Sequence, residues 1–326
     1  EDARQVLQLA AVIGQQFQKD VLHSLVEAEH ELGSWLAQLE RSDLIRPAGM
    51  DALADYVFPD ALVQEVAYEN LLVQRRQEFH SKIGLAMENL FLKAAGGNTL
   101  LAEEALAQRC ELLAYHFERS NDVERAIRYL EMAGHKAQSE FANETALQNY
   151  TQLLARLKQR GADWRKIFDV LYRRQQIHGL LGNKTARQAD LDEMMTLAGE
   201  DAGARMVTLN ALADLYQWTS HYPEAIAAAQ QALELAVQLS DLAGQAEALN
   251  TMGIIAYYQA EYDRARPLLL QACELRKAIG DPAGLAWSTM YLGMMDFMEG
   301  NFSEAGRSHA HALEMARQRH DVLQTA

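Results

Sequence analysis

The stretch Leu249-Asn250-Thr251-Met252-Gly253 belongs to a pattern that recurs every 40 residues. It aligns with Leu209-Asn210-Ala211-Leu212-Ala213 and with Thr289-Met290-Tyr291-Leu292-Gly293. The alignment continues through an aromatic position, two alanine positions and an acidic position: Tyr222, Tyr262 and Phe302; Ala225, Ala265 and Ala305; Ala232, Ala272 and Ala312; Asp241, Asp281 and Asp321. A fixed period predicts repeated units, each of which buries its apolar face only by stacking on a neighbour.

Each unit is expected to be a hairpin of two helices. A small residue at Ala213, Gly253 or Gly293 allows the first helix to approach the second closely, and the recurring alanines do the same from the second helix. The acidic position falls at the turn between units. The chain contains only 5 prolines and no long alternation of β-branched residues, so we expect it to be almost entirely helical.

These small, aromatic and alanine positions resemble the tetratricopeptide repeat, in a long form with extended helices. The resemblance implies a right-handed tetratricopeptide-type α-solenoid. With the arm of residues 1–95, which is expected to be a winged helix, the chain is predicted to have an all-α fold that includes a small two-stranded wing. Residues 202–326 are expected to hold three regular repeats and residues 102–201 irregular ones, and the array is open to continuing past Ala326. Such repeats are typical of binding scaffolds, but a fold by itself does not identify what is bound.

Residues 1–95 predict an arm of a different kind. Helices are expected over 2–13, 20–28 and 31–42, followed by short strands at 44–47 and 55–58 around a turn at 48–51. Three helices and a two-stranded wing form a winged-helix pattern. The outer face of the third helix carries Glu31 and Glu40, whose carboxylates would repel phosphates, so the arm is not expected to bind DNA.

The segment from Tyr56 to Leu72, with the sequence YVFPDALVQEVAYENLL, is followed by Arg75, Arg76 and His80. It is similar to the segment that follows the ATPase core in STAND-type signalling ATPases, among them large bacterial transcription regulators and cyclase-linked predicted ATPases. The resemblance implies that Arg75, Arg76 and His80 contact the ATPase core of a longer parent protein, or an acidic partner. The alternative is a solvated helix face. Where the family has a histidine, this chain has Asp60, which is expected to cap the next helix.

Composition excludes several classes of partner. The net charge of −15 and the pI near 5.1 oppose binding to nucleic acids or anionic membranes. No stretch approaches the roughly 18 apolar residues of a membrane span, and there is no signal peptide, so a cytoplasmic location is expected. The two cysteines, Cys110 and Cys273, are expected to be reduced core residues. The chain begins and ends within apparent helices, so we expect it to be a piece of a longer protein.

No motif for catalysis is present. The sequence contains no Gly-x-x-x-x-Gly-Lys-Ser/Thr loop, no Gly-x-Gly-x-x-Gly after a strand and no Gly-x-Ser-x-Gly. His309 and His311 are two residues apart on a helix and point in different directions, so they cannot share a metal ion. We therefore expect no enzymatic activity and no cofactor; an ATP site of the parent protein would lie outside this chain.

The concave face of the repeats is the predicted binding site, because the first helix of each hairpin lines it. The residues expected to be exposed there are Asn210, Asp214, Gln217, Trp218, Asn250, Tyr257, Tyr258, Trp287, Met290 and Met294. Asn210 and Asn250 occupy equivalent positions, and an asparagine can both donate to and accept from a peptide backbone. Met and aromatic side chains suit an adaptable apolar contact. The alternative for the Met set is packing against a following hairpin.

The chain is therefore predicted to be a non-catalytic sensor and scaffold segment of a STAND-type signalling ATPase. Its repeats would bind a protein, a peptide or a small inducer, and the arm would report to the ATPase core. Two alternatives stay open. One is a constitutive protein-assembly scaffold, and the other is the effector-binding part of a transcription regulator whose DNA-binding module lies outside this chain.

Overall fold

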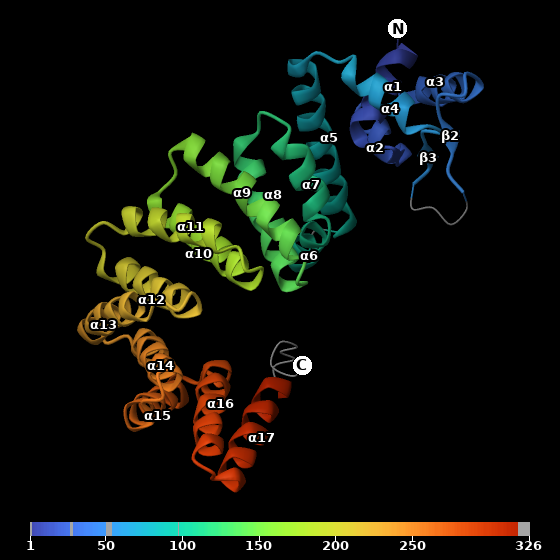
Figure 1. Ribbon diagram of the computed structural model, residues 1–326. Coiled ribbons are helices and arrows are strands. Elements are labelled where there is room, and N and C mark those ends of the chain that lie inside the picture. The colour runs from blue at the N-terminus through green and yellow to red at the C-terminus, as the bar shows by residue number, and fades with distance from the viewer. Residues whose placement is uncertain (1, 27–28, 50–53, 97, 319–326) are drawn as a thin grey trace. The chain divides into compact units, whose positions relative to one another are not determined.

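The computed structural model describes residues 2–26, 29–49, 54–96 and 98–318. That part of the chain contains 17 helices and three short strands (Figure 1). Contacts within the chain define two compact units, residues 1–170 (unit 1) and residues 171–326 (unit 2), with the boundary inside α10 (Trp164–Leu180). Within the described ranges, no helix has the length and apolar character needed to cross a membrane.

The arm of unit 1 begins with α1 (Asp2–Ile13), α2 (Lys19–His23) and α3 (Glu29–Arg41). Leu9, Leu22 and Leu36 lie in its core, each with at most 2% of its surface exposed. The second helix is shorter than the predicted 20–28: the backbone amides of Ser24 and Leu25 close a turn after His23, and residues 27 and 28 lie outside the described residues.

A sheet of three strands, rather than the predicted two, completes the arm. The strands β1 (Gln16–Phe17), β2 (Arg46–Pro47) and β3 (Tyr56–Val57) pair antiparallel in the order β1-β3-β2. Phe17 is buried and its ring stacks on Tyr56 at 5.6 Å. A two-residue strand shows no alternating pattern in a sequence, so β1 became evident only through its pairing. Residues 50 and 51 of the predicted turn lie outside the described residues.

Asp60 begins α4 (Ala61–Glu69) as its cap. Its Oδ1 accepts a hydrogen bond from the backbone N–H of Leu62 at 2.9 Å. This satisfies one of the amides that the first turn of a helix leaves unpaired. The predicted capping role of Asp60 is therefore confirmed.

After the arm and before α10, the described part of unit 1 contains five further helices. These are α5 (Val73–Ala94), α6 (Thr99–Gln108), α7 (Cys110–Glu118), α8 (Val123–Ser139) and α9 (Asn143–Arg160). The apolar positions that face the interior of these hairpins are all buried: Leu113, Ala114, Phe117, Ala126, Leu130 and Ala133. Helix α5 packs directly on α7, and the arm and the first hairpins belong to unit 1. The predicted division into 1–95, 102–201 and 202–326 stays a prediction.

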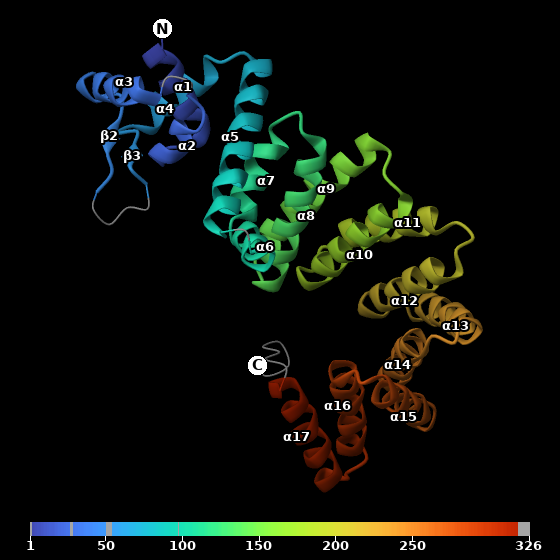
Figure 2. The same cartoon turned by 180° about the vertical axis from the view of Figure 1, so that it is seen from behind.

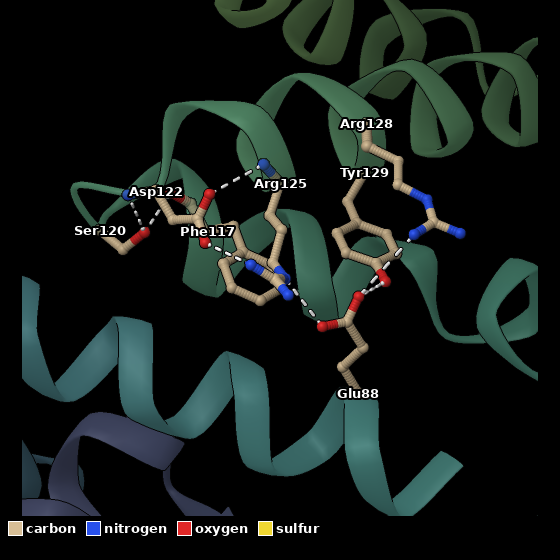
Figure 3. A network of polar contacts seen from close by, with 7 residues as sticks. All are labelled: Glu88, Phe117, Ser120, Asp122, Arg125, Arg128 and Tyr129. Atoms are coloured by element: carbon tan, nitrogen blue, oxygen red, sulfur yellow. Dashed lines mark hydrogen bonds and ion pairs between the residues drawn. The ribbon is translucent and has the colours of Figure 1, made fainter. Parts of the chain in front are cut away.

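A buried carboxylate joins two of these helices, α5 and α8 (Figure 3). Glu88 on α5 is only 6% exposed. Its oxygens accept hydrogen bonds from Tyr129 Oη at 2.5 Å and Arg125 Nε at 2.8 Å, both on α8. Arg125 also binds Asp122, whose carboxylate caps α8. Since each acceptor meets a donor, the network offsets the cost of burying the charge.

Unit 2 continues from α10 through α11 (Lys184–Ala198) into the three regular repeats (Figure 2). Their first helices are α12 (Ala202–Trp218), α14 (Leu242–Tyr258) and α16 (Pro282–Met298). Their second helices are α13 (Tyr222–Gln238), α15 (Tyr262–Ile279) and α17 (Phe302–Gln318). Each first helix packs on its own second helix, as predicted. The all-helical fold is thus confirmed, with a three-stranded sheet in place of the two-stranded wing.

The small residues of the repeat lie where helices approach closely. A Cβ at Gly253 would come within 2.8 Å of Cγ of Leu269, a fully buried residue of α15. Ala213 occupies the equivalent position in the preceding repeat and is 0% exposed. Ala232 and Ala272 are also completely buried. The periodic small residues therefore set the distance between helices, as predicted.

Turn geometry repeats with the same period. Asp241 and Asp281 accept hydrogen bonds from backbone amides and cap α14 and α16, whereas Asp321 lies outside the described residues. Inside the hairpins, Ser220, Ala260 and Gly300 occupy equivalent positions and adopt left-handed φ angles of 62°, 59° and 84°. Only glycine takes this conformation without a steric cost. The hairpin turn therefore requires a left-handed backbone at this position even where the residue is serine or alanine.

Candidate functional site

The first helices of unit 2 form one layer of the array. α12 packs on α14 and α14 packs on α16, whereas the second helices contact each other less. An array curves toward the side on which its elements lie closer together, so the first helices line the concave side. We call this surface the inner face.

An aromatic cluster lies on the inner face, where α14 meets α16. The ring of Tyr291 lies between those of Tyr257, Trp287 and Tyr258, with centroid distances of 5.6, 5.9 and 6.2 Å. The hydroxyls of Tyr258 and Tyr291 are 3.2 Å apart. Tyr291 is 3% exposed; burial and the contact with Tyr258 raise its pKa, so its hydroxyl stays protonated.

Tyr291 was not among the predicted site residues, although the cluster is built around it. The two other repeats carry Ala211 and Thr251 at the equivalent position. A bulky aromatic where the other repeats have small residues was the available signal. The structure brings the predicted Tyr257, Tyr258 and Trp287 together through this residue.

Exposed apolar side chains end each first helix. Trp218, Tyr258 and Met298 occupy equivalent positions and are 57%, 50% and 59% exposed. The exposure predicted for Trp218 and Tyr258 is confirmed. Met290 and Met294, by contrast, are partly buried and pack with Trp287 against the core of α14, α15 and α16.

The two asparagines are buried, so their predicted exposure is wrong. Asn210 and Asn250 are 7% and 3% exposed. Nδ2 of Asn210 donates to the carbonyl oxygen of Gly244 at 3.2 Å, and Oδ1 of Asn250 accepts from Oγ of Ser288 at 2.8 Å. Both side chains therefore connect neighbouring first helices, because close packing of these helices covers the position. A role in ligand binding stays a prediction for both.

A buried arginine explains why the equivalent asparagines have different partners. Arg276 on α15 is 4% exposed and donates to the carbonyl oxygen of Gly284 at 2.5 Å and to Oγ of Ser288 at 2.6 Å. Gly284 is the equivalent of Gly244, so Arg276 takes the carbonyl that Asn250 would otherwise bind. The preceding repeat has alanine at the position of Arg276, and Asn210 keeps the carbonyl.

Two carboxylates on the inner face are held by arginines of α11 and α15. Asp214 lies 2.7 Å from Arg187, and Glu247 lies 2.9 Å from Arg276. Both arginines are almost completely buried, while the Asp214 and Glu247 side chains are 34% and 51% exposed. Gln217, which was predicted to be exposed beside Asp214, is 6% exposed, because that side of α12 packs into the array; this part of the prediction is wrong.

The pKa of Glu247 is shifted by its surroundings. Burial raises its pKa, Arg276 opposes that effect, and Asp214 adds to it. Tyr172 on α10 is 36% exposed, and burial followed by the charge of Glu247 raises its pKa.

The predicted contacts of the arm lie on α5 in unit 1. Arg75 is 45% exposed, pairs with Glu78 at 3.2 Å and lies over the ring of Phe79. Arg76 is 24% exposed and pairs with Glu69 at 3.1 Å. His80 is completely buried, so its predicted surface contact is wrong: α5 turns this position toward α7, where its Nδ1 lies 3.0 Å from Nδ1 of His116.

Among the described residues, no group of three or more His, Cys, Asp or Glu side chains could hold a metal ion. Cys110 and Cys273 are free and buried. The inner face thus presents aromatic surfaces beside fixed carboxylates, an arrangement that suits non-covalent binding.

Comparison with known proteins supports the assignment of the repeats. A tetratricopeptide repeat family model matches residues 205–278, which cover most of the first two regular repeats, from within α12 to the last turn of α15. No curated protein matches the sequence. The chain therefore contains a tetratricopeptide helical repeat domain.

Solved structures with similar folds share little sequence with this chain. A Rap protein complexed with competence and sporulation factor is 13% identical, with a TM-score of 0.56 over 80% of this chain and 71% of that chain. Aspartyl phosphate phosphatase F from Bacillus subtilis is 12% identical, with a TM-score of 0.52 over 99% and 76%. At this identity the likeness shows the fold alone.

A signal transduction ATPase with numerous domains (STAND) protein from Pyrococcus horikoshii, which has a tetratricopeptide repeat sensor, is 15% identical with a TM-score of 0.45. All of this chain aligns with 52% of that one. The chain therefore spans about half the length of that protein.

Proposed function

We propose that unit 2 binds an extended peptide segment of a protein partner along its inner face. The observation that carries this proposal is the row of half-exposed apolar side chains, including Trp218 and Tyr258, at the ends of consecutive first helices. Aromatic residues dominate the energetics of protein interfaces because each buries a large area with few rotatable bonds.

The groups on this face are held in place before any partner arrives. Tyr258 is positioned by its contacts with Tyr291, and the carboxylates of Asp214 and Glu247 are positioned by arginines. Fixed groups lose less conformational entropy on binding. The aromatic rings suit apolar side chains of the peptide, and the carboxylates can accept hydrogen bonds from its amides.

Selection from a library of random peptides displayed on phage, with the purified chain as bait, tests the proposal. Peptides that bind are measured by calorimetry against Trp218→Ala and Tyr258→Ala. We expect each substitution to weaken binding about tenfold, roughly 1.4 kcal/mol. Val237→Ala is the matched control, since Val237 is 58% exposed on the second helix α13. Equal binding by all variants would contradict the proposal.

We further propose that the chain is a non-catalytic sensor segment of a STAND-type signalling ATPase. The support is the sequence resemblance of residues 56–80 and the packing of α5 on α7, which joins the arm directly to the first hairpins. In the full-length parent protein, a peptide selected on unit 2 should change the rate of ATP hydrolysis. Binding without any change in that rate would favour a constitutive scaffold instead.

The arm offers a surface for the proposed contact with an ATPase core. Leu62 and Val66 of α4 are 60% and 51% exposed and border an apolar pocket of about 390 Å³, which Leu7 and Leu44 also line. Because His80 is buried, we expect the ATPase core to contact this surface of α4 together with Arg75 and Arg76. Val66→Ser in the full-length parent should change basal ATP hydrolysis, whereas an unchanged rate would exclude α4 from the contact.

A further inference from the structure

A second pocket, of about 420 Å³, lies in unit 1, away from the residues that carry the proposed function. Its walls come from the end of α4, from α5, from the turn between α7 and α8, and from α9. Six of the lining side chains carry guanidinium or amide groups: Arg76, Arg119, Arg156, Gln77, Asn121 and Gln159. We call this site the arginine pocket.

The arginine pocket is positive in a strongly negative protein. Its three arginines are opposed by one lining carboxylate, Glu118, which lies 3.2 Å from Arg119 and 3.7 Å from Arg156. A second carboxylate, Glu69, reaches Arg76 from the surface, where it is 59% exposed. The lining thus has a formal charge of +2, whereas the chain has −15.

Backbone carbonyls hold all three guanidinium groups. Arg76 donates to the carbonyl of Leu71 at 2.9 Å, Arg119 to that of Tyr115 at 3.2 Å, and Arg156 to that of Glu118. A neutral carbonyl orients the guanidinium without cancelling its charge. Further N–H groups remain for a ligand: Nε and Nη2 of Arg119 make no hydrogen bond within the described part of the chain.

Aromatic rings restrict the same arginines. The guanidinium of Arg76 lies 5.0 Å from the ring centre of Tyr68, and that of Arg119 lies 4.1 Å from the ring centre of Tyr115. Stacking on a ring fixes the plane of the guanidinium. The pocket therefore presents oriented cations, at side-chain exposures of 24%, 39% and 24% for Arg76, Arg119 and Arg156.

His80 lies in the wall of the pocket and responds to this charge. Its Nε2 lies 3.1 Å from the hydroxyl of Tyr68. Burial, followed by the charges of Arg119 and Arg76, lowers the pKa of His80 to about 4. The ring is therefore neutral near pH 7, and the positive field comes from the arginines.

The turn between α7 and α8, which carries Arg119 and Asn121, is held rigidly (Figure 3). Oγ of Ser120 donates to the carbonyl of Phe117 and accepts from the backbone N–H of Asp122. Asp122 in turn is tied through Arg125 to Glu88. One wall of the pocket is therefore preorganised.

We infer that the arginine pocket binds the phosphate group of a small ligand. Guanidinium groups bind phosphate oxygens through paired, charge-assisted hydrogen bonds, and a dianion would compensate the +2 charge of the lining. The volume exceeds that of a single phosphate and falls in the range of small-molecule sites. The amides of Gln77, Asn121 and Gln159 would contact the remainder of the ligand.

The test titrates the purified chain with pyrophosphate, inorganic phosphate and succinate at constant ionic strength, by calorimetry and thermal unfolding. We expect pyrophosphate to bind most tightly and to raise Tm. Arg119→Gln and Arg156→Gln should each weaken its binding at least tenfold. Arg128→Gln is the control: this arginine of α8 is 54% exposed and does not line the pocket, so binding should change less than twofold.

Three results would overturn the inference. The first is a wild-type protein that binds neither pyrophosphate nor phosphate. The second is equal loss of binding in the Arg128→Gln control, which would indicate nonspecific attraction. The third is binding of succinate without either phosphate compound, which would make the pocket a carboxylate site. If a Gln variant has a lowered Tm without ligand, Arg119→Lys is measured in its place. Lysine keeps the positive charge but cannot form the paired hydrogen bonds of a guanidinium, so it should still weaken pyrophosphate binding.

Discussion

Unit 1 and the regular repeats of unit 2 hold their helices together with different kinds of side chain. Between α14 and α15 the contact is made by Gly253, Ala272 and Leu269, with no charged group at the closest approach. Between α5, α7 and α8 it includes the buried Glu88 and the buried rings of His80 and His116. Small residues allow the same helix spacing in every repeat, whereas each buried polar network requires its own specific set of partner side chains.

The difference explains where unique features arise. Unit 2 departs from the repeat at the buried residues Arg276, Ser288 and Tyr291, and these residues make the polar and aromatic contacts near α16. The arginine pocket of unit 1 is built from residues that do not recur with the 40-residue period. The exposed side chains Trp218, Tyr258 and Met298 of unit 2, by contrast, follow that period.

The largest expected effect comes from breaking the network in unit 1. Glu88→Ala should lower the free energy of unfolding of unit 1 by about 3 kcal/mol, because it removes the partner of the buried Tyr129 hydroxyl and one of the two carboxylates that bind Arg125. Hydrogen exchange resolved by mass spectrometry measures each unit separately. Protection in unit 2 should change far less; an equal loss in both would show that the units do not unfold separately.

Acid should destabilise unit 1 through its two buried histidines. Burial lowers the pKa of His80 to about 4, and burial together with His80 lowers that of His116 to about 3. Unfolded histidine has a pKa near 6.5. Below that pH the unfolded chain binds protons that the native state does not, so the stability present above about pH 6.5 is lost on acidification. Between about pH 7.5 and 5 the loss is on the order of 2 kcal/mol for each ring.

Unit 2 should respond less to acid. Burial lowers the pKa of His178, but the raised pKa of Glu247 acts in the opposite direction, because native Glu247 binds a proton more readily than the unfolded chain. Hydrogen exchange at about pH 7.5 and pH 5, corrected for intrinsic exchange rates, measures the loss of stability in each unit. His116→Gln should reduce the pH dependence of unit 1, and a dependence unchanged by that substitution would exclude this histidine as its source.

A methyl group added inside the repeat interface tests the role of small residues. Gly253→Ala should destabilise unit 2 by about 2 kcal/mol, since the new Cβ would be 2.8 Å from Leu269 Cγ. Gly306→Ala is the matched control in α17, where the added Cβ meets no atom within 4 Å. It should stabilise by up to about 1 kcal/mol through helix propensity. Urea unfolding of both variants measures the contrast; the same sign for both would contradict it.

The smallest effect concerns the hairpin turns. Ala260→Gly should stabilise unit 2 by about 1 kcal/mol, because Ala260 has a φ of 59°. Gly300→Ala, at the equivalent position, should destabilise by a similar amount. Thermal unfolding of the pair should show opposite shifts in Tm. Shifts in the same direction would mean that the two turns do not share one conformation.

The repeats of unit 2 were predictable because each position appears three times. The helices, the small residues at Gly253 and Ala272 and the caps at Asp241 and Asp281 all follow from the period. The strand β1 did not, because two residues carry no pattern of their own. The exposure of the first helices was only partly predictable, since they pack on both sides: Trp218 and Tyr258 at the helix ends are exposed, but Asn210 and Asn250 are buried.

The sequence alone determined the helical repeats, the acidic composition and the cap at Asp60, because these depend on periodicity, charge counts and local hydrogen bonds. Tertiary structure decided which side chains meet. It placed Tyr291 among Tyr257, Tyr258 and Trp287, and it brought together in the arginine pocket the arginines Arg76 and Arg156, which are 80 positions apart in the sequence. No local pattern encodes such contacts, since they depend on how several helices pack at once.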